Sequence, residues 1–286
     1  MNSIDYLTKE ASIIVNLYNS KNFSEAIRKS KIVIKKHPDE ILFYNILSLS
    51  LSAKNENTEA IKYLDSALNK QPNNIYVLNN LGLIHSKLHI FDKAEYYFQE
   101  SLKNNPDFFD ALLNYGNLFL NKNDHKQAIT FYKKAFDAAK NDLLKETSLI
   151  TLGNTYQQIG DFESSRKIYK KILQINPQCT KADKAISLIH KYKSLNDEHF
   201  TQMIRKVSSI KDKENYKSLS FALGKAYEDL GNFDESFNYL KAANDIEKQQ
   251  LNYRIENDLE IFSNIKKFFL ENEISSINNP NKKIIF

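Results

Sequence analysis

Few side chains in this sequence have the types and spacing that catalysis or metal binding requires. His85 and His89 lie four residues apart, which on a helix lets two imidazoles share an ion, but no third ligand is spaced to complete a site. Gly224 and Lys225 lack the glycine-rich lead of a phosphate-binding loop. The carboxylates are scattered along helical patterns, so no pair is brought together for acid–base chemistry. We therefore predict no catalytic residue, no metal and no cofactor.

Side-chain amides are the polar groups that recur at regular spacing. An amide can accept a backbone N–H and donate to a backbone C=O whatever the neighbouring side chain is, so a row of amides suits an extended peptide. The candidate partner-binding residues are eight such amides and one apolar side chain. They are Asn45, Asn79, Asn80, Leu83, Asn114, Asn117, Asn154, Gln157 and Gln158. Such a row requires elements that present the same face again and again.

A sequence repeat of 34 residues predicts elements that present the same face repeatedly. Pro38, Pro72 and Pro106 are 34 residues apart, and Pro177 follows Pro106 at twice that spacing plus three. A small residue recurs in the same register, as Ala26, Ala60, Ala94 and Ala128. A repeat of this length predicts pairs of antiparallel helices that stack on their neighbours.

All six glycines follow the same period, and each has an expected task. Position 8 of the repeat, where two helices must approach closely, holds Gly82, Gly116, Gly153 and Gly224. Position 15, where a left-handed residue is expected to end the first helix, holds Asn55, His89, Asn123, Gly160 and Gly231. Side chains expected to cap the second helix follow three residues later, as Ser24, Thr58, Asp92 and Asp234.

These positions resemble the tetratricopeptide repeat, a pattern of Leu-Gly, Tyr, Ala, an aromatic residue, Ala and Pro. A clear copy consists of Leu78, Leu81, Gly82, Ala94, Phe98 and Pro106. The resemblance implies an all-α fold, a right-handed α-solenoid of antiparallel helix pairs with about six to seven hairpins and a C-terminal capping helix. It also implies that positions 2, 5, 6, 9 and 12 of the first helices line a concave, partner-binding groove.

The expected organisation is one solenoid over residues 1–250. Its repeats lie near 7–40, 41–74, 75–108, 109–145, 146–179 and 217–250, with a degenerate pair at 180–216. Three residues are inserted between Ala135 and Glu146, which predicts a longer second helix there. Spacings of three and four from Ile255 to Phe269 predict an amphipathic capping helix at 251–270. Residues 271–286 are expected to form a linker and a strand without a partner.

The amides have two interpretations. Asn80 and Asn114 resemble the asparagine ladder of eukaryotic O-linked N-acetylglucosamine transferases, but amides at this position also stabilise the hairpin itself. Asn117 and Asn154 are the favoured ligand contacts, and replacing them with Ala is predicted to weaken partner binding without lowering the melting temperature. A groove that clamps a terminal carboxylate is disfavoured, because Leu83 occupies one of the positions where Lys or Arg is needed.

Residues 221–244 resemble the last repeat of bacterial tetratricopeptide–sulfotransferase fusions, from Phe221-Ala-Leu-Gly to Ala243-Asn244. The resemblance implies that a sulfotransferase domain follows residue 286 in a longer gene product and that this chain recruits the acceptor. The alternative is a stand-alone adaptor in complex assembly, with no linked enzyme.

Composition limits the partners. The formal net charge is +5, but Lys alternates with Asp and Glu along the helical patterns, so we predict a solvated surface and no nucleic-acid partner. No run of apolar residues reaches membrane-spanning length, and the start of the chain does not resemble a signal peptide. Together with the single cysteine, Cys179, these features favour a cytoplasmic protein whose partner is a protein or peptide.

Overall fold

The computed structural model describes residues 3–251 and 255–271, which form helices joined by turns, with no strand among them. The chain divides into two compact units, unit 1 at Met1–Ala182 and unit 2 at Asp183–Phe286. The helices that begin in unit 1 are α1 (Ser3–Asn19), α2 (Phe23–Lys36), α3 (Ile41–Ala53), α4 (Asn57–Lys70), α5 (Ile75–Lys87), α6 (Phe91–Asn104), α7 (Phe109–Asn121), α8 (His125–Ala138), α9 (Asp142–Gln158), α10 (Phe162–Ile175) and α11 (Thr180–Ile189). The all-α helical-repeat solenoid predicted from the sequence is confirmed.

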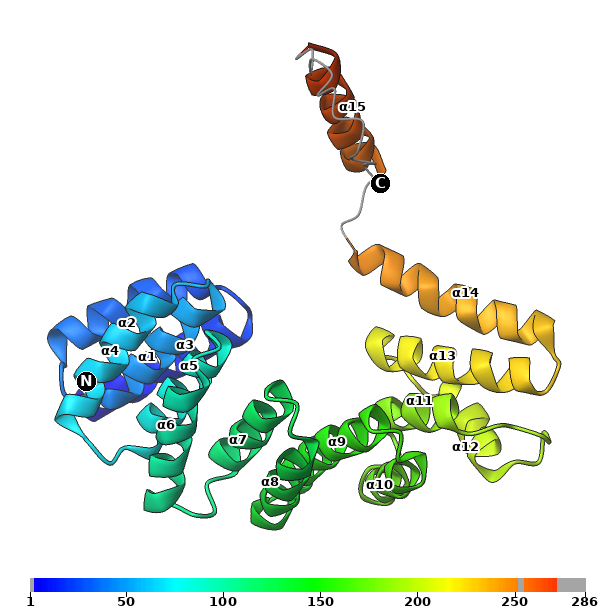
Figure 1. Ribbon diagram of the computed structural model, residues 1–286, viewed down its shortest axis with the longest axis horizontal. Coiled ribbons are helices and arrows are strands. Elements are labelled where there is room, and N and C mark those ends of the chain that lie inside the picture. The colour runs from blue at the N-terminus through cyan, green and yellow to red at the C-terminus, as the bar shows by residue number, and fades with distance from the viewer. Residues whose placement is uncertain (1–2, 252–254, 272–286) are drawn as a thin grey trace, which may run out of the picture. The chain divides into compact units, whose positions relative to one another are not determined.

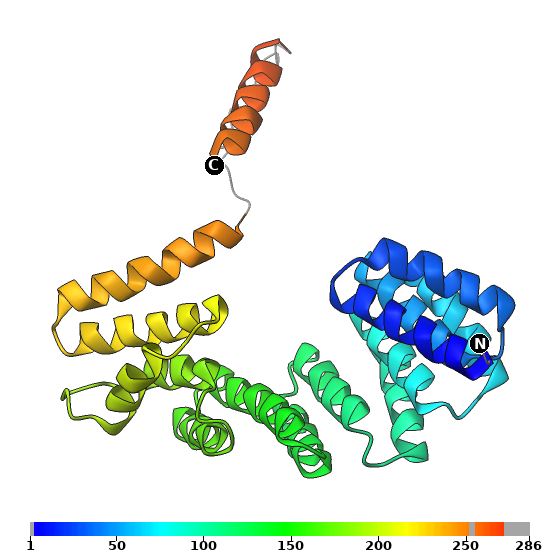
Figure 2. The ribbon, with the colours of Figure 1, turned by 180° about the vertical axis from the view of Figure 1, so that it is seen from behind.

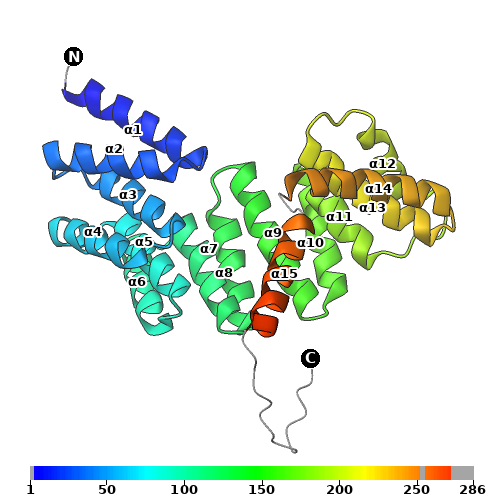
Figure 3. The ribbon, with the colours of Figure 1, turned by 90° about the horizontal axis from the view of Figure 1, so that it is seen from above.

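Unit 1 is a series of helical hairpins in which consecutive helices lie side by side (Figures 1 and 3). The second helix of each hairpin buries a stripe at helical spacing, as Ala60, Leu64 and Ala67 do in α4. The first helices α1, α3, α5 and α7 also contact one another in order, whereas α9 makes its main contacts with α8 and α10. A continuous face of first helices therefore extends from α1 to α7.

Glycine at position 8 is required by the packing inside the hairpins that carry it. A Cβ atom added to Gly116 would lie 2.5 Å from Cε1 of Tyr132, which comes from the second helix of the same hairpin. The same atom added to Gly153 would lie 2.8 Å from Cζ of Tyr169. The close helix approach predicted at this position is confirmed, and the buried tyrosine rings fill the space that the missing side chains leave.

The turns inside the hairpins agree with one sequence prediction and contradict another. Positive φ angles occur at Asn55, His89, Asn123, Gly160 and Gly231 as predicted, and also at Lys21. The predicted second-helix caps are wrong, because the N-cap is the residue directly after the left-handed one. Four of these N-cap side chains, in unit 1 and unit 2, accept a backbone N–H, namely Asn22, Asp124, Asp161 and Asn232.

The three-residue insertion does not lengthen the second helix of its repeat, so that prediction is also wrong. α8 has 14 residues, the same length as α6, whereas α9 has 17 residues where α7 has 13. Ala139 is extended and ends α8, and the Asn141 side chain then caps α9 by accepting the N–H of Leu144 at 3.0 Å. The added residues therefore extend the first helix of the following hairpin at its N-terminus.

Unit 2 contains α12 (Glu198–Val207), α13 (Lys213–Asp229), α14 (Phe233–Gln250) and α15 (Ile255–Glu271). α13 and α14 lie side by side as an antiparallel hairpin (Figure 2). α11 and α12, of ten residues each, occupy the segment predicted as a degenerate pair. A helix is present where the capping helix was predicted, with exposed apolar side chains such as Leu259. Its capping role stays a prediction, and the strand predicted near the C-terminus lies outside the described residues.

Candidate functional site

The first helices of unit 1 carry the amides singled out from the sequence. Asn45 lies on α3, Asn79 and Asn80 on α5, and Asn114 on α7. Asn45, Asn79 and Asn80 are buried, with exposed fractions of 9%, 6% and 7%. We call these four residues the amide row. Because they come from three helices that contact one another in order, their side chains meet across the helix interfaces.

The amide row is joined by a chain of hydrogen bonds. Asn114 Nδ2 donates to Asn79 Oδ1 at 3.0 Å, and Asn79 Nδ2 donates to Asn80 Oδ1 at 3.3 Å. Asn80 Nδ2 in turn donates to Asn45 Oδ1 at 2.9 Å. A buried amide costs free energy unless it is paired, so this chain lets polar side chains occupy the interface between α3, α5 and α7.

Two amide atoms at the ends of this chain remain available to a ligand. Asn114 Oδ1 and Asn45 Nδ2 make no hydrogen bond within the described protein, and neither is a buried atom. The bonds to the neighbouring asparagines also determine which way each end amide points. Unit 1 therefore presents a fixed acceptor on α7 and a fixed donor on α3.

Asn117 and Asn154 are oriented by a different partner, a buried tyrosine of the same hairpin. Tyr132 Oη donates to Asn117 Oδ1 at 2.7 Å, and Tyr169 Oη donates to Asn154 Oδ1 at 2.6 Å. The two tyrosine side chains are buried, and burial raises the pKa of each to about 12, so both hydroxyls are protonated at neutral pH. With Oδ1 engaged, the Nδ2 group of each asparagine is the atom left to donate to a ligand.

The remaining candidates take no part in the hydrogen bonds that join the amide row. Leu83 on α5 is 37% exposed. On α9, Gln157 Oε1 accepts a weaker hydrogen bond from Tyr169 Oη at 3.4 Å, and the side chain of Gln158 is exposed. Hydrogen bonds thus connect the α9 amides to α10, whereas those of the amide row link α3, α5 and α7.

A hollow of about 420 Å³ lies over the amide row. Asn45, Asn79 and Asn80 line it together with the exposed side chains of Leu42 and Tyr76, which are 50% and 55% accessible. Asp110, at the start of α7, also lines the hollow. It therefore combines paired amides, two open apolar surfaces and one carboxyl group.

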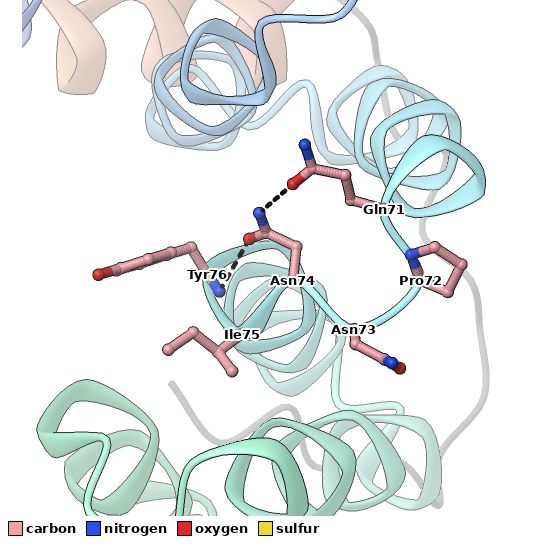
Figure 4. A pocket seen from close by; sticks show the side chains of 6 residues that line it. All are labelled: Gln71, Pro72, Asn73, Asn74, Ile75 and Tyr76. Atoms are coloured by element: carbon pink, nitrogen blue, oxygen red, sulfur yellow. Dashed lines mark hydrogen bonds between the residues drawn. The ribbon is translucent and has the colours of Figure 1, made fainter.

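A neighbouring hollow of about 470 Å³ follows the turn from α4 to α5 and shares Asn74 and Tyr76 with the first one. Figure 4 shows how the turn is held. Asn74 Nδ2 donates to Gln71 Oε1 at 2.9 Å, and Asn74 Oδ1 accepts the backbone N–H groups of Tyr76 and Val77. These bonds cap α5 and fix the backbone from which the Tyr76 ring projects.

Sequence reasoning missed Leu42, Tyr76 and Asp110. Each occupies position 2 of its repeat, one of the positions expected to line the groove. The selection followed amides alone, and these three side chains are an alkyl group, a phenol and a carboxyl group. A search of position 2 for any large or charged side chain would have found them.

Burial raises the pKa of Asp110, and no charged neighbour contributes to this shift. Its carboxyl group makes no ion pair or hydrogen bond within the described residues, although it lies in the first turn of α7, where a negative charge is favoured. Asp110 remains solvent-exposed as a residue, so the surrounding protein removes only part of the water around its carboxyl group, and it provides no counter-charge.

The two histidines considered as metal ligands serve packing and backbone roles. The His85 ring is 4% exposed and stacks on Tyr97 with ring centroids 5.5 Å apart, and burial lowers its pKa. His89 adopts the left-handed conformation at the end of α5. Among residues 3–251 and 255–271, no three His, Cys, Asp or Glu side chains gather as metal ligands would.

Unit 2 contains a buried network of ionisable groups on α11, α12 and the segment between them. Asp183, 1% exposed, accepts hydrogen bonds from Lys206 Nζ and, at 3.2 Å, from His199 Nε2. His199 Nδ1 is 2.7 Å from the hydroxyl of Tyr192, which is fully buried and has a raised pKa. Burial keeps a substrate away from these groups, so we assign the network to holding α11 and α12 together.

No helix within residues 3–251 and 255–271 has both the length and the apolar character that crossing a bilayer requires.

Comparison with known proteins agrees with the hairpin geometry. Sequence families described as tetratricopeptide repeat match residues 75–108, 107–178 and 218–250. Among curated proteins, none is significantly similar to this chain.

Solved structures share the fold at low sequence identity. The Cut9–Hcn1 hetero-tetramer of the APC/C contains a chain with 17% identity and a TM-score of 0.55, and the match covers 82% of this chain and 42% of that one. PilF of Pseudomonas aeruginosa has 15% identity and a TM-score of 0.53, with 81% and 96% covered. A tetratricopeptide repeat protein of Parabacteroides merdae has 15% identity and a TM-score of 0.52, with 90% and 97% covered.

These identities are low, so the structural likeness shows the fold alone. The repeat families match both units, and their matched segments coincide with hairpins from α5 to α10 and with α13 and α14. The sequence matches and the helical hairpins therefore agree that residues 75–178 and 218–250 form tetratricopeptide-type repeats.

Proposed function

We propose that unit 1 is a protein-interaction scaffold that binds an extended segment of a partner polypeptide along the first helices α3, α5 and α7. The observation that carries the proposal is the fixed orientation of three side-chain amides, the two at the ends of the amide row and that of Asn117. Asn114 offers an acceptor, while Asn45 and Asn117 offer donors, and each is held by a hydrogen bond on its opposite side. An extended backbone presents N–H and C=O groups that complement such atoms.

Orientation matters because a free amide would lose rotational freedom on binding. An amide already fixed by a neighbour loses less, so more of the hydrogen-bond energy contributes to affinity. The apolar surfaces of Leu42 and Tyr76 beside the amide row provide area that a partner side chain can cover. Backbone recognition and one side-chain anchor are thus available in one place.

Another repeat of the same chain suggests a variant that tests the amide donor of Asn117. In the repeat at 75–108, position 9 is Leu83 and the ring packed on Gly82 is Phe98, which has no hydroxyl. The double substitution Asn117→Leu with Tyr132→Phe copies that natural pair. It removes the donor without leaving a buried hydroxyl unpaired, so the hairpin is expected to stay folded.

The experiment selects peptides on the wild-type protein from a displayed library of random 12-residue sequences. The affinity of a selected peptide is then measured by fluorescence anisotropy. Losing one neutral hydrogen bond costs about 0.5–1.5 kcal/mol, so the double variant should bind about 2- to 12-fold more weakly. The matched control is Asn104→Ala on α6, which removes an exposed amide whose bond is to its own helix. No selected peptide, or equal affinities for both variants, would overturn the proposal.

A linked sulfotransferase is a second proposal, and it rests on the resemblance of residues 221–244 and on the strand predicted near the C-terminus. That sequence pattern favours a parent protein in which this chain recruits an acceptor for a following sulfotransferase domain; the alternative is a stand-alone adaptor. Coding sequence after residue 286 distinguishes them, since a phosphosulfate-binding loop would support the first and an immediate stop codon the second. The cytoplasmic location is likewise a proposal, tested by fractionating cells that express the tagged protein.

A further inference from the structure

Asp110 is the one charged side chain on the inner positions of the first helices from α3 to α9. Positions 2, 5, 6, 9 and 12 of the four helices α3, α5, α7 and α9 otherwise hold amides, hydroxyls and apolar side chains. Electrostatic recognition on this face therefore depends on a single carboxyl group.

The surroundings of Asp110 suit a long side chain with a cationic end. The hollow of about 420 Å³ that Asp110 lines also contains the exposed alkyl group of Leu42 and the exposed ring of Tyr76. Lys and Arg carry an apolar stem that covers such surfaces while the charged end stays in reach of an anion. A cation can also be attracted to the face of the Tyr76 ring.

The lack of a basic partner for Asp110 within the described residues also favours a cationic ligand. Several acidic side chains in unit 1 have basic neighbours, such as Glu95 with Lys122 at 2.9 Å and Glu59 with Lys31 at 2.8 Å. Asp110 has none among the described residues. An unpaired carboxylate at the edge of a hollow can pair with a cation supplied by a partner without first breaking an internal ion pair.

We propose that the hollow over the amide row is specific for a peptide segment in which a Lys or Arg stands next to an apolar residue, with the cationic group paired to Asp110. This inference rests on the proposed function and names the chemistry of the partner. The apolar residue covers Leu42 and Tyr76, the basic residue reaches Asp110, and the amide row binds the backbone between them.

The test is peptide selection from the same random library on wild type, Asp110→Asn and Asp110→Lys. Wild type is expected to enrich peptides with Lys or Arg beside an apolar residue. Asp110→Asn should lose the preference for a basic residue, and Asp110→Lys should replace it with Asp or Glu. The matched control is Asp107→Asn, which makes the same charge change at an exposed residue in the turn before α7 and should leave the selected sequences unchanged.

Affinity measurements make the outcome quantitative. A basic peptide selected on wild type should bind Asp110→Asn about 3- to 10-fold more weakly, and raising the salt concentration should weaken binding to wild type more than to the variant. Thermal melting of each variant verifies that it is folded, since Asp110 also lies in the first turn of α7.

Failure of this inference is distinguishable from failure of the proposed function. Peptides that are enriched without a basic residue, or with the same preference on Asp110→Asn, would overturn the specificity and leave peptide binding intact. No enriched peptide on any variant would overturn both.

Discussion

The hydrogen bond between Tyr132 and Asn117 is expected to make a measurable contribution to the stability of unit 1. The perturbations are Asn117→Ala, Tyr132→Phe and the two together. Sequence reasoning predicted that Asn117→Ala spares the melting temperature. The structure argues against that part of the prediction, because the Asn117 side chain accepts a 2.7 Å hydrogen bond from a buried tyrosine.

The expected magnitudes follow from which group is left unpaired. Asn117→Ala leaves the buried Tyr132 hydroxyl without its acceptor, which costs about 1–3 kcal/mol. Tyr132→Phe removes the hydroxyl and leaves a half-buried amide that reaches solvent, so its cost is about 0.5–1.5 kcal/mol. In the double variant neither group is orphaned, and the loss should be smaller than the sum of the two single losses by about 1 kcal/mol.

Urea unfolding followed by circular dichroism measures these free energies. Because each repeat contacts mainly its neighbours, the curves are fitted with nearest-neighbour terms instead of a single two-state transition. Gln158→Ala, at an exposed amide on the next first helix, is the control and should change stability by less than about 0.5 kcal/mol. Additive effects of the two single substitutions, or an Asn117→Ala protein as stable as wild type, would refute the reasoning.

Two further predictions concern the same buried rings. Gly116→Ala would place a Cβ atom 2.5 Å from Tyr132, so thermal melting should show a loss of about 1–3 kcal/mol, and Gly116→Ala combined with Tyr132→Leu should lose less than the two substitutions separately. Burial raises the pKa of Tyr132 and Tyr169 from the usual 10 to about 12, so the folded state holds these protons more tightly than the unfolded state. The stability that these two protonated hydroxyls contribute should be complete below pH 10 and be lost as the pH rises from 10 to 12. Absorbance at 295 nm follows the ionisation of tyrosine, and circular dichroism follows unfolding over the same range. The prediction would be contradicted if all tyrosines in the folded protein titrated near pH 10.

Hairpin boundaries were predictable because they depend on local residue types. Asn55 and Gly160 were expected to be left-handed, since both types tolerate positive φ, and both are. Lys21 was missed because nothing in a lysine side chain favours that conformation, and the repeat imposes it there. The predicted caps were wrong because the left-handed residue is followed at once by the N-cap, so Asp161 caps α10 directly after Gly160.

The bonds within the candidate site could not be predicted, because they join residues far apart in the chain. Periodicity placed Asn45, Asn80 and Asn114 at comparable positions on successive first helices. Whether one amide reaches the next depends on the distance and rotation between those helices, which are set by packing across α3, α5 and α7. The same applies to the insertion after Ala135, whose effect on α9 follows from the cap at Asn141.

The comparison of repeats within the chain links the core to the binding face. Where position 9 is asparagine, as at Asn117 and Asn154, the ring packed on the hairpin glycine is a tyrosine whose hydroxyl bonds that asparagine. Where position 9 is Leu83, the ring is Phe98, which has no hydroxyl to satisfy. A buried tyrosine without this acceptor would bear an unpaired hydroxyl, so the two positions cannot change independently without loss of stability. The core tyrosines thereby determine where unit 1 presents an amide donor, and a change of partner specificity at position 9 requires a matching change in the core.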